Sequence, residues 1–235
     1  MGAGEKHTPP QKARTSGSGS ADLAWRSPLA VVLFVCITAA GLTADLLTKH
    51  YAFTPFLADP QLAENVQLAQ ASHHGTLTNR QVLQLLGRRG ELMPGVSISL
   101  STNPGVVFGL SMPRWAVTCA TILTMALVGW FFASGERNAW AVHVALALIL
   151  AGAMGNFHDR LFSEVALPGM APIRNEVRDF IDCSRIPLPF GLRYVWVFNV
   201  ADAWLVLGVA TLPVHWLLSG RKEQKARSKK TPSRS

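Results

Sequence analysis

Charged residues and cysteines are both scarce in this sequence. Only 15% of the 235 residues are Asp, Glu, Lys or Arg, against the roughly 25% that is usual for soluble domains, while 49% are hydrophobic. This composition argues against an ordinary soluble enzyme and against a disordered chain, so the surplus apolar side chains are expected to face lipid. The three Cys include no CxxC pair, which argues against a disulfide framework and against a structural zinc site.

Several signatures of catalytic sites are also missing. The sequence contains no HExxH, no GxSxG and no GxxxxGK(S/T). These absences argue against a zinc protease, a serine hydrolase with a nucleophile elbow and a phosphate-binding loop. Lys49 could serve a Ser–Lys pair, but no Ser is placed to partner it. Because no set of His, Cys and carboxylate residues has the spacing of metal ligands, we expect neither a metal nor another cofactor.

Four long apolar segments predict four membrane-spanning helices. They cover about residues 28–50, 115–135, 138–157 and 196–219. A cleaved signal peptide is the alternative for the first segment. Three further apolar segments follow it, however, and its flank is not a clean small-residue cleavage site.

Basic residues gather at the two ends of the chain. Residues 1–27 and 220–235 hold 11 of the 22 Lys and Arg. The positive-inside rule therefore predicts that both ends are cytoplasmic, with 1–27 a flexible tail and 220–235 a basic tail. The basic run could instead bind nucleic acid, but a basic tail directly after a membrane helix is typical of a topology signal, so no nucleic-acid partner is expected.

Two larger segments, 52–114 and 158–193, are then expected outside the cytoplasm. Within the first, Val96, Ile98 and Leu100 alternate with serines, which predicts a strand, and an Asn-Pro-Gly turn follows. Residues 79–89 predict a short amphipathic helix.

Four carboxylates lie at or near membrane level, where ionisable groups are costly and usually functional. They are Asp45, Asp159, Asp179 and Asp202. Asp202 lies a few residues into the fourth span, and Asp179 lies upstream on the same side of the membrane. Two carboxylates brought close cannot both ionise easily, so one can take a proton from water while the other donates toward a carbonyl oxygen. The pair predicts amide hydrolysis without a covalent intermediate.

Two other interpretations of this pair stay open on the residues alone. Asp202 could simply hydrogen-bond a neighbouring helix. Alternatively, the chain could be a small transporter or channel subunit in which Asp179 and Asp202 relay a proton or cation. A transporter would favour an inverted repeat, and the sequence contains no visible repeat.

Five motifs, in this order on four spans, resemble the lipoprotein signal peptidases (signal peptidase II) of bacterial inner membranes. The motifs are Asp45-Leu-Leu-Thr48-Lys49, Asn103-Pro-Gly105-Val-Val-Phe108-Gly109, Gly152-Ala-Met-Gly155-Asn156-Phe-His-Asp159-Arg160, Val177-Arg-Asp179-Phe180-Ile181 and Phe198-Asn199-Val-Ala201-Asp202. The resemblance implies that residues 28–219 form an integral membrane aspartyl peptidase domain. The implied fold is an all-α membrane protein of four helices, with a small β-cradle and a loop and helix segment outside.

The resemblance also implies the site. Its catalytic dyad maps onto Asp179 and Asp202, and its supporting or substrate-binding residues map onto Asp45, Asn103, Gly105, Asn156, Asp159, Arg160 and Asn199. The Asn side chains are expected to orient the dyad and hold the substrate backbone. Asp159 and Arg160 are expected to brace the segment that carries Asp179.

The implied substrate is a prolipoprotein whose cysteine already carries a diacylglyceryl group, with cleavage just before that cysteine. The acyl chains would stay in the bilayer while the scissile amide meets the dyad, in a monomeric enzyme of the bacterial cytoplasmic membrane. Segments 52–93 and 164–176 look longer than is usual for the family, and Val106 and Val107 replace the smaller Ala that is common there.

Overall fold

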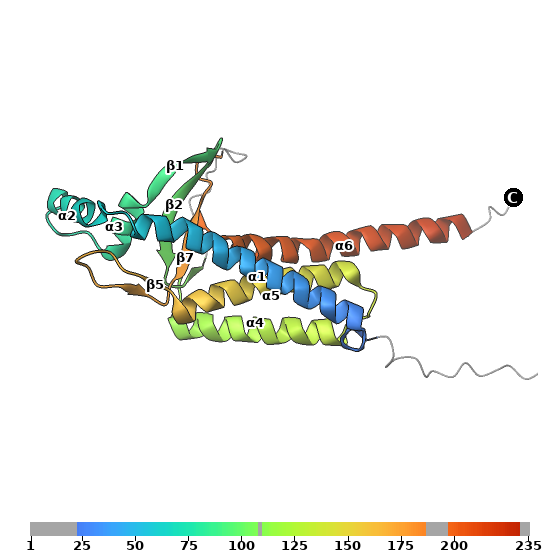
Figure 1. The fold of residues 1–235 in the computed structure, drawn as a ribbon. Coiled ribbons are helices and arrows are strands. Elements are labelled where there is room, and N and C mark those ends of the chain that lie inside the picture. Colours follow the sequence, from blue (N-terminus) through green and yellow to red (C-terminus); the bar gives the residue numbers. More distant parts are fainter. Residues whose placement is uncertain (1–22, 108–109, 187–196, 231–235) are drawn as a thin grey trace, which may run out of the picture.

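The computed structural model describes residues 23–107, 110–186 and 197–230, and it consists of a helical bundle with a β-rich part at one end (Figure 1). The helices are α1 Pro28–Leu57, α2 Leu62–Ser72, α3 Asn79–Leu86, α4 Arg114–Ser134, α5 Trp140–Phe162 and α6 Val200–Lys230. The strands are β1 Arg88–Met93, β2 Val96–Asn103, β3 Val106–Val107, β4 Leu110–Ser111, β5 Glu164–Val165, β6 Ile173–Arg174, β7 Val177–Asp182 and β8 Val197–Phe198.

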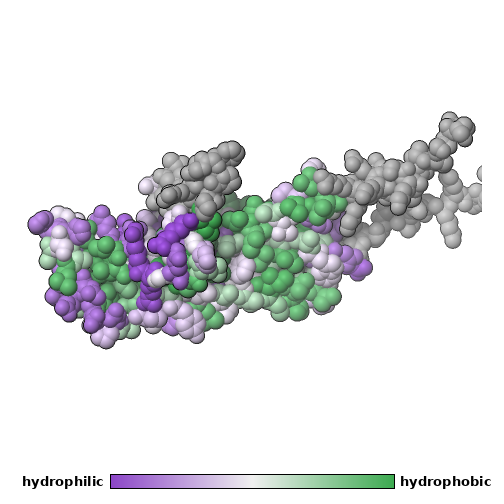
Figure 2. All heavy atoms as spheres, turned by 90° about the horizontal axis from the view of Figure 1, so that it is seen from above, coloured by the Kyte–Doolittle hydropathy of each residue, from purple (hydrophilic) through white to green (hydrophobic). Residues whose placement is uncertain are grey.

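Four of these helices, α1, α4, α5 and α6, are long and apolar enough to cross a membrane, which confirms the four predicted spans. Helix α5 is the central one. In its most apolar stretch of 18 residues, 56% of the residues are buried, against 11% in the corresponding stretches of α4 and α6. Large apolar side chains such as Trp130, Val206 and Trp216 point outward from the bundle. Figure 2 shows apolar side chains over the helical part of the molecule, where they can contact lipid chains.

The fold mixes helices with sheet, so the label all-α was wrong, although four long apolar helices and a small sheet are both present as expected. Strands β1, β2, β7 and β8 form an antiparallel sheet in that order. The predicted alternating strand is β2, and it pairs with β7, where Asp179 lies opposite Ser101. The sequence does not reveal this pairing, because β2 and β7 are far apart in the chain and pairing at that distance leaves no trace in local periodicity.

The start of α1 and the end of α6 lie at the opposite end of the bundle from the sheet (Figure 1). Ala24 donates its N–H to the carbonyl oxygen of Gly135 at 2.8 Å, which places the start of α1 beside the turn between α4 and α5. Helix α6 runs toward this same end. Helices α2 and α3 and the four-stranded sheet occupy the other end.

Helix α1 continues to Leu57, beyond the predicted limit at residue 50. Within this helix, Asp45 and Lys49 lie one helical turn apart, and their opposite charges pair at 2.7 Å. The predicted amphipathic helix is α3, which begins at a capping box formed by Thr78 and Gln81. The long segment 52–93 therefore holds the end of α1, α2, α3 and β1, and segment 164–176 holds the β5–β6 hairpin.

Candidate active site

Asp202 is positioned by the first turn of α6. Asn199 is the residue just before the helix, and its side-chain oxygen accepts the Asp202 N–H at 3.0 Å. In return, the Asp202 carboxylate accepts the Asn199 N–H at 3.2 Å. This reciprocal pair is the geometry of a capping box, which satisfies two backbone donors that a helix start leaves free. The same hydrogen bonds hold the Asp202 carboxylate in one orientation.

Asp179 lies in the middle of β7 and is only 4% exposed. Its Oδ1 atom accepts a hydrogen bond from the Asn199 side-chain amide at 2.7 Å. Burial, followed by the charge of Asp202, raises the pKa of Asp179 well above the ordinary Asp value. Asn199 therefore connects the two carboxylates, and one of them is held in surroundings that favour its protonated form.

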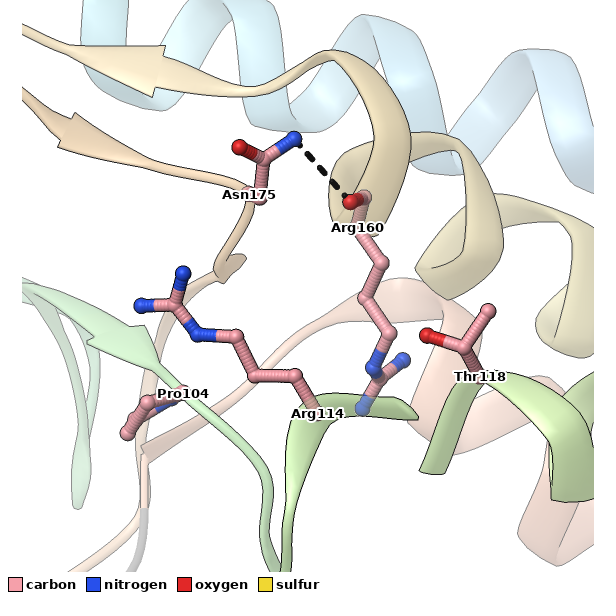
Figure 3. Close-up of a pocket in the computed structure, with 5 residues that line it drawn as sticks. All are labelled: Pro104, Arg114, Thr118, Arg160 and Asn175. Carbon is pink, nitrogen blue, oxygen red and sulfur yellow. Dashed lines mark hydrogen bonds between the residues drawn. The ribbon is translucent and has the colours of Figure 1, made fainter. Parts of the chain in front are cut away.

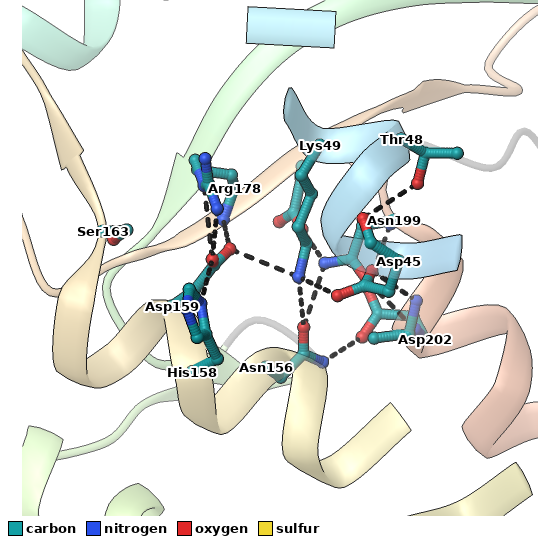
Figure 4. A network of polar contacts seen from close by, with 12 residues as sticks. Asp45, Thr48, Lys49, Asn156, His158, Asp159, Ser163, Arg178, Asn199 and Asp202 are labelled. Atoms are coloured by element: carbon teal, nitrogen blue, oxygen red, sulfur yellow. Dashed lines mark hydrogen bonds and ion pairs between the residues drawn. The ribbon is translucent and has the colours of Figure 1, made fainter. Parts of the chain in front are cut away.

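Asn156 on α5 joins the pair from a third element (Figure 4). Its Nδ2 donates to Asp202 Oδ1 at 2.8 Å. Its Oδ1 accepts from Asn199 Nδ2 at 3.1 Å and from Lys49 Nζ at 3.3 Å. Both ends of the Asn156 amide are thus used, so the side chain cannot rotate without losing several hydrogen bonds.

Lys49 forms the centre of a buried charge cluster beside Asp179 and Asp202. Its side chain is fully buried, with Nζ 2.7 Å from Asp45 Oδ2 and 3.2 Å from Asp159 Oδ2. The other oxygen of Asp45 accepts the Ala201 N–H at the start of α6, at 2.9 Å. A carboxylate is favourable at this position because helix starts carry partial positive charge. The cluster ties α1 and α5 to the helix that carries Asp202.

Asp159 is braced in addition by the residue that precedes Asp179. Arg178 donates to Asp159 from its backbone N–H at 2.9 Å, from Nε at 3.2 Å and from Nη2 at 2.7 Å. A planar guanidinium and a backbone amide together allow little rotation of the carboxylate. Asp159 is thus linked both to Lys49 and to the strand that carries Asp179.

Close helix packing around this cluster requires glycine at position 155. A Cβ atom there would lie 2.3 Å from Asp45 Oδ2, far inside van der Waals contact. Gly152, one turn earlier, meets the backbone of α6 in the same way, since its Cβ would lie 2.3 Å from the Ala201 carbonyl oxygen. The two glycines let α5 approach both α1 and α6 closely enough for the hydrogen bonds to form.

An open apolar cavity of ≈ 490 Å³ borders Asp202. Apart from Asp202 and Cys183, its walls are apolar, and they are formed by Ile186, Phe198, Ala203, Val206 and Leu207. Within the described residues, no group of three or more His, Cys, Asp or Glu side chains is placed to hold a metal ion. The arrangement combines a carboxylate pair, suited to general acid–base work, with a surface for an apolar ligand.

The sequence profile of the peptidase A8 family, described as signal peptidase (SPase) II, matches residues 37–218. The chain belongs to the signal peptidase II family. It is therefore a protease, and the four apolar helices make it a multi-pass membrane protein.

Named relatives agree with this assignment. A lipoprotein signal peptidase of Desulfitobacterium hafniense (strain DSM 10664 / DCB-2) is 35% identical over 124 residues, which cover 52% of this chain and 70% of that protein. One of Bartonella quintana (strain Toulouse) is 29% identical over 152 residues, covering 64% and 81%. A bacterial membrane enzyme solved by the in meso method at 2.3 Å shares the fold, with a TM-score of 0.53, 23% identity and coverage of 87% of this chain and 95% of that one.

The three remaining predicted site residues of this signal peptidase II lie in the turn after β2 and near the end of α5, where the charge of Arg160 interacts with both Asp179 and Asp202. Asn103 and Gly105 form the turn after β2, where the Asn103 side chain accepts the Gly105 N–H at 2.9 Å and Gly105 has a φ of 124°. Arg160 donates to the backbone oxygen of Asn156 at 3.3 Å. Its guanidinium lines a small pocket that Arg114 also borders (Figure 3).

Sequence reasoning misses two residues of the site, Lys49 and Arg178. Lys49 ends the first motif but is given no role there beyond a possible partner for a serine, although the spacing of four residues from Asp45 is the spacing of a helical ion pair. Arg178 offers no signal of this kind, because Asp159 is 19 positions away on another element.

Proposed function

We propose that this signal peptidase II removes the signal peptide of a diacylglyceryl-modified prolipoprotein by hydrolysing the amide just before the lipidated cysteine, with Asp179 and Asp202 as its catalytic dyad. One observation carries the assignment of the dyad. Asn199 bonds both carboxylates, and Asp202 borders the apolar cavity. The names of the relatives, lipoprotein signal peptidases, support the substrate class.

The two carboxylates divide the chemistry between them. Asp202, whose two oxygens both accept N–H hydrogen bonds, takes a proton from water. The resulting hydroxide forms a bond to the carbonyl carbon while Asp179, with its raised pKa, donates its proton to the carbonyl oxygen. The tetrahedral intermediate then breaks its C–N bond. The amine leaves with the proton held by Asp202, and Asp179 recovers a proton from the intermediate's hydroxyl group.

The position of the site suits a substrate anchored in lipid. Lys49 lies 21 residues after Pro28 in α1, which is about 30 Å along a helix and close to the thickness of the hydrocarbon core. The dyad therefore lies near one membrane surface. Acyl chains can stay in the bilayer beside the apolar cavity. We infer that this surface is the outer face of the bacterial cytoplasmic membrane, because the basic tails favour cytoplasmic termini.

A cleavage assay tests the proposal. The purified protein in detergent is given a diacylglyceryl-modified precursor and the same precursor without lipid, and only the first should be cleaved rapidly. Asp179→Asn and Asp202→Asn should each lower the rate by at least about 10²–10⁴-fold, since Asn is nearly isosteric but cannot exchange the proton.

Asp182→Asn is the matched control, because Asp182 lies on the same strand and its carboxylate accepts the Ser184 N–H at 2.8 Å, outside the dyad network. It should cleave at the parent rate. Near-normal cleavage by either dyad variant would contradict the assignment of that residue. Ion flux through reconstituted vesicles without any cleavage would favour a relay function instead.

A further inference from the structure

Helix α3, part of the long segment after α1, contacts strand β2 and the residue directly before β7, the strand that carries the catalytic Asp179. Arg80 and Gln84 are one helical turn apart, so they share one face of α3. Arg80 binds Glu176, the residue directly before β7, through two hydrogen bonds. Gln84 donates to the Ser101 hydroxyl at 3.0 Å, and Ser101 is the residue that pairs with Asp179 across the ladder.

Glu176 is an unusual residue for this position because it is a charged side chain with 2% exposure. Arg80 Nε lies 2.8 Å from its Oε2, and Arg114 at the start of α4 lies 3.1 Å from its Oε1. Burial alone would raise the pKa of Glu176, but the hydrogen bonds of Arg80, the Thr102 side chain and the charges of Arg80 and Arg114 outweigh it and hold the pKa below its ordinary value. The carboxylate is therefore charged and fixed at neutral pH.

The backbone of Glu176 is held as firmly as its side chain. The Ser163 hydroxyl at the end of α5 donates to the Glu176 carbonyl at 2.5 Å and accepts the Glu176 N–H at 3.2 Å. Helix α3 also makes apolar contacts with the sheet, since its Val82 and Leu83 are fully buried in the same apolar cluster as Leu100 and Phe180. Phe180 directly follows Asp179, so α3 supports the catalytic strand on both sides of the carboxylate.

We propose that Arg80 and Gln84 of α3 are positioning residues for the reaction, which hold Asp179 in register with Asp202 by clamping Glu176 and Ser101. The inference rests on the proposed dyad. A strand advances about 3.3 Å per residue, so a clamp three residues from Asp179 acts within about 10 Å of it. Displacement of a reacting group by about 1 Å can cost about 10²-fold in rate, and this makes a remote clamp effective.

Steady-state cleavage of the lipidated precursor by Arg80→Ala, Arg80→Lys and Gln84→Ala tests the clamp. Arg80→Ala should lower kcat by about 10- to 100-fold while KM stays at the parent value, because α3 acts on the dyad and not on the substrate. Arg80→Lys should recover part of kcat, since it keeps the charge but loses the bidentate geometry. Arg174→Ala is the matched control, since it removes an exposed arginine paired with exposed Glu164, and its kcat should not change.

A double variant and a folding measurement separate positioning from stability. Glu176→Gln combined with Arg80→Ala should lower kcat no further than the stronger single change, because both remove one clamp. A KM effect with normal kcat, or normal kcat with a lower melting temperature, would overturn the inference. If Arg80→Ala does not fold, the kcat values of Arg80→Lys and Gln84→Ala decide. Activity in Asp179→Asn would instead refute the dyad itself, so the two failures are distinguishable.

Discussion

Replacing Lys49 by Met should destabilise the protein strongly, because it leaves a buried carboxylate without its cation. Lys49, Asp45 and Asp159 all have fully buried side chains. After the change, Asp159 keeps Arg178 at 2.7 Å. Among the described residues, Lys49 is the only cation paired with Asp45, which would retain the Ala201 N–H as a donor.

The magnitude follows from one uncompensated charge. Removing one partner of a buried ion pair costs about 3–5 kcal/mol. In a chain of this size, 1 kcal/mol lowers the melting temperature by about 2–4 °C, so Lys49→Met should lose about 6–20 °C. Adding Asp45→Asn removes the orphaned charge, and the double variant should therefore recover most of this loss.

Thermal unfolding in detergent, followed by tryptophan fluorescence, measures the effect. The control is Arg185→Ala, which breaks an exposed pair with Glu91 and should cost at most about 1 kcal/mol. A Lys49→Met protein as stable as the parent would refute the reasoning. So would a double variant no more stable than Lys49→Met, since the loss would then come from packing and not from the unpaired carboxylate of Asp45.

Three further predictions concern the dyad, the helix packing and the topology. The raised pKa of Asp179 favours its protonated form, and the mechanism needs that proton, so kcat should fall as the pH rises through this pKa. A pH profile that stays flat on the alkaline side while the protein remains folded would be inconsistent with Asp179 as the acid. Gly155→Ala should prevent α5 from packing on α1, since its Cβ would lie 2.3 Å from Asp45 Oδ2. Size-exclusion chromatography in detergent should then show aggregated or poorly recovered protein. Gly129→Ala is the control, since its Cβ meets no atom within 4 Å, and it should behave as the parent. Reporter fusions placed in the turn between α4 and α5 and after the end of the α6 span should both indicate the cytoplasm, and an external signal at either would contradict the proposed orientation.

Local patterns in the sequence are sufficient for the elements whose physical cause is itself local. Long apolar runs predict helices that cross a membrane because lipid offers no partners to an exposed backbone. The alternation from Val96 to Ser101 predicts β2 because side chains on a strand point to opposite faces in turn. The cost of placing ionisable groups at membrane level is enough to mark four carboxylates as candidates from the sequence alone, namely Asp45, Asp159, Asp179 and Asp202.

Contacts between distant residues are decided by the tertiary structure alone. The ladder between β2 and β7 joins Ser101 to Asp179, and no periodicity within either segment carries that register. The hydrogen bond of Asn199 to Asp179 depends on where β7 lies beside the start of α6, and its bond to Asn156 depends on how closely α5 packs against α6, which glycines permit but do not specify. A sequence can thus name residues suited to a reaction, whereas the distances that let them act together arise only when separate elements pack against one another.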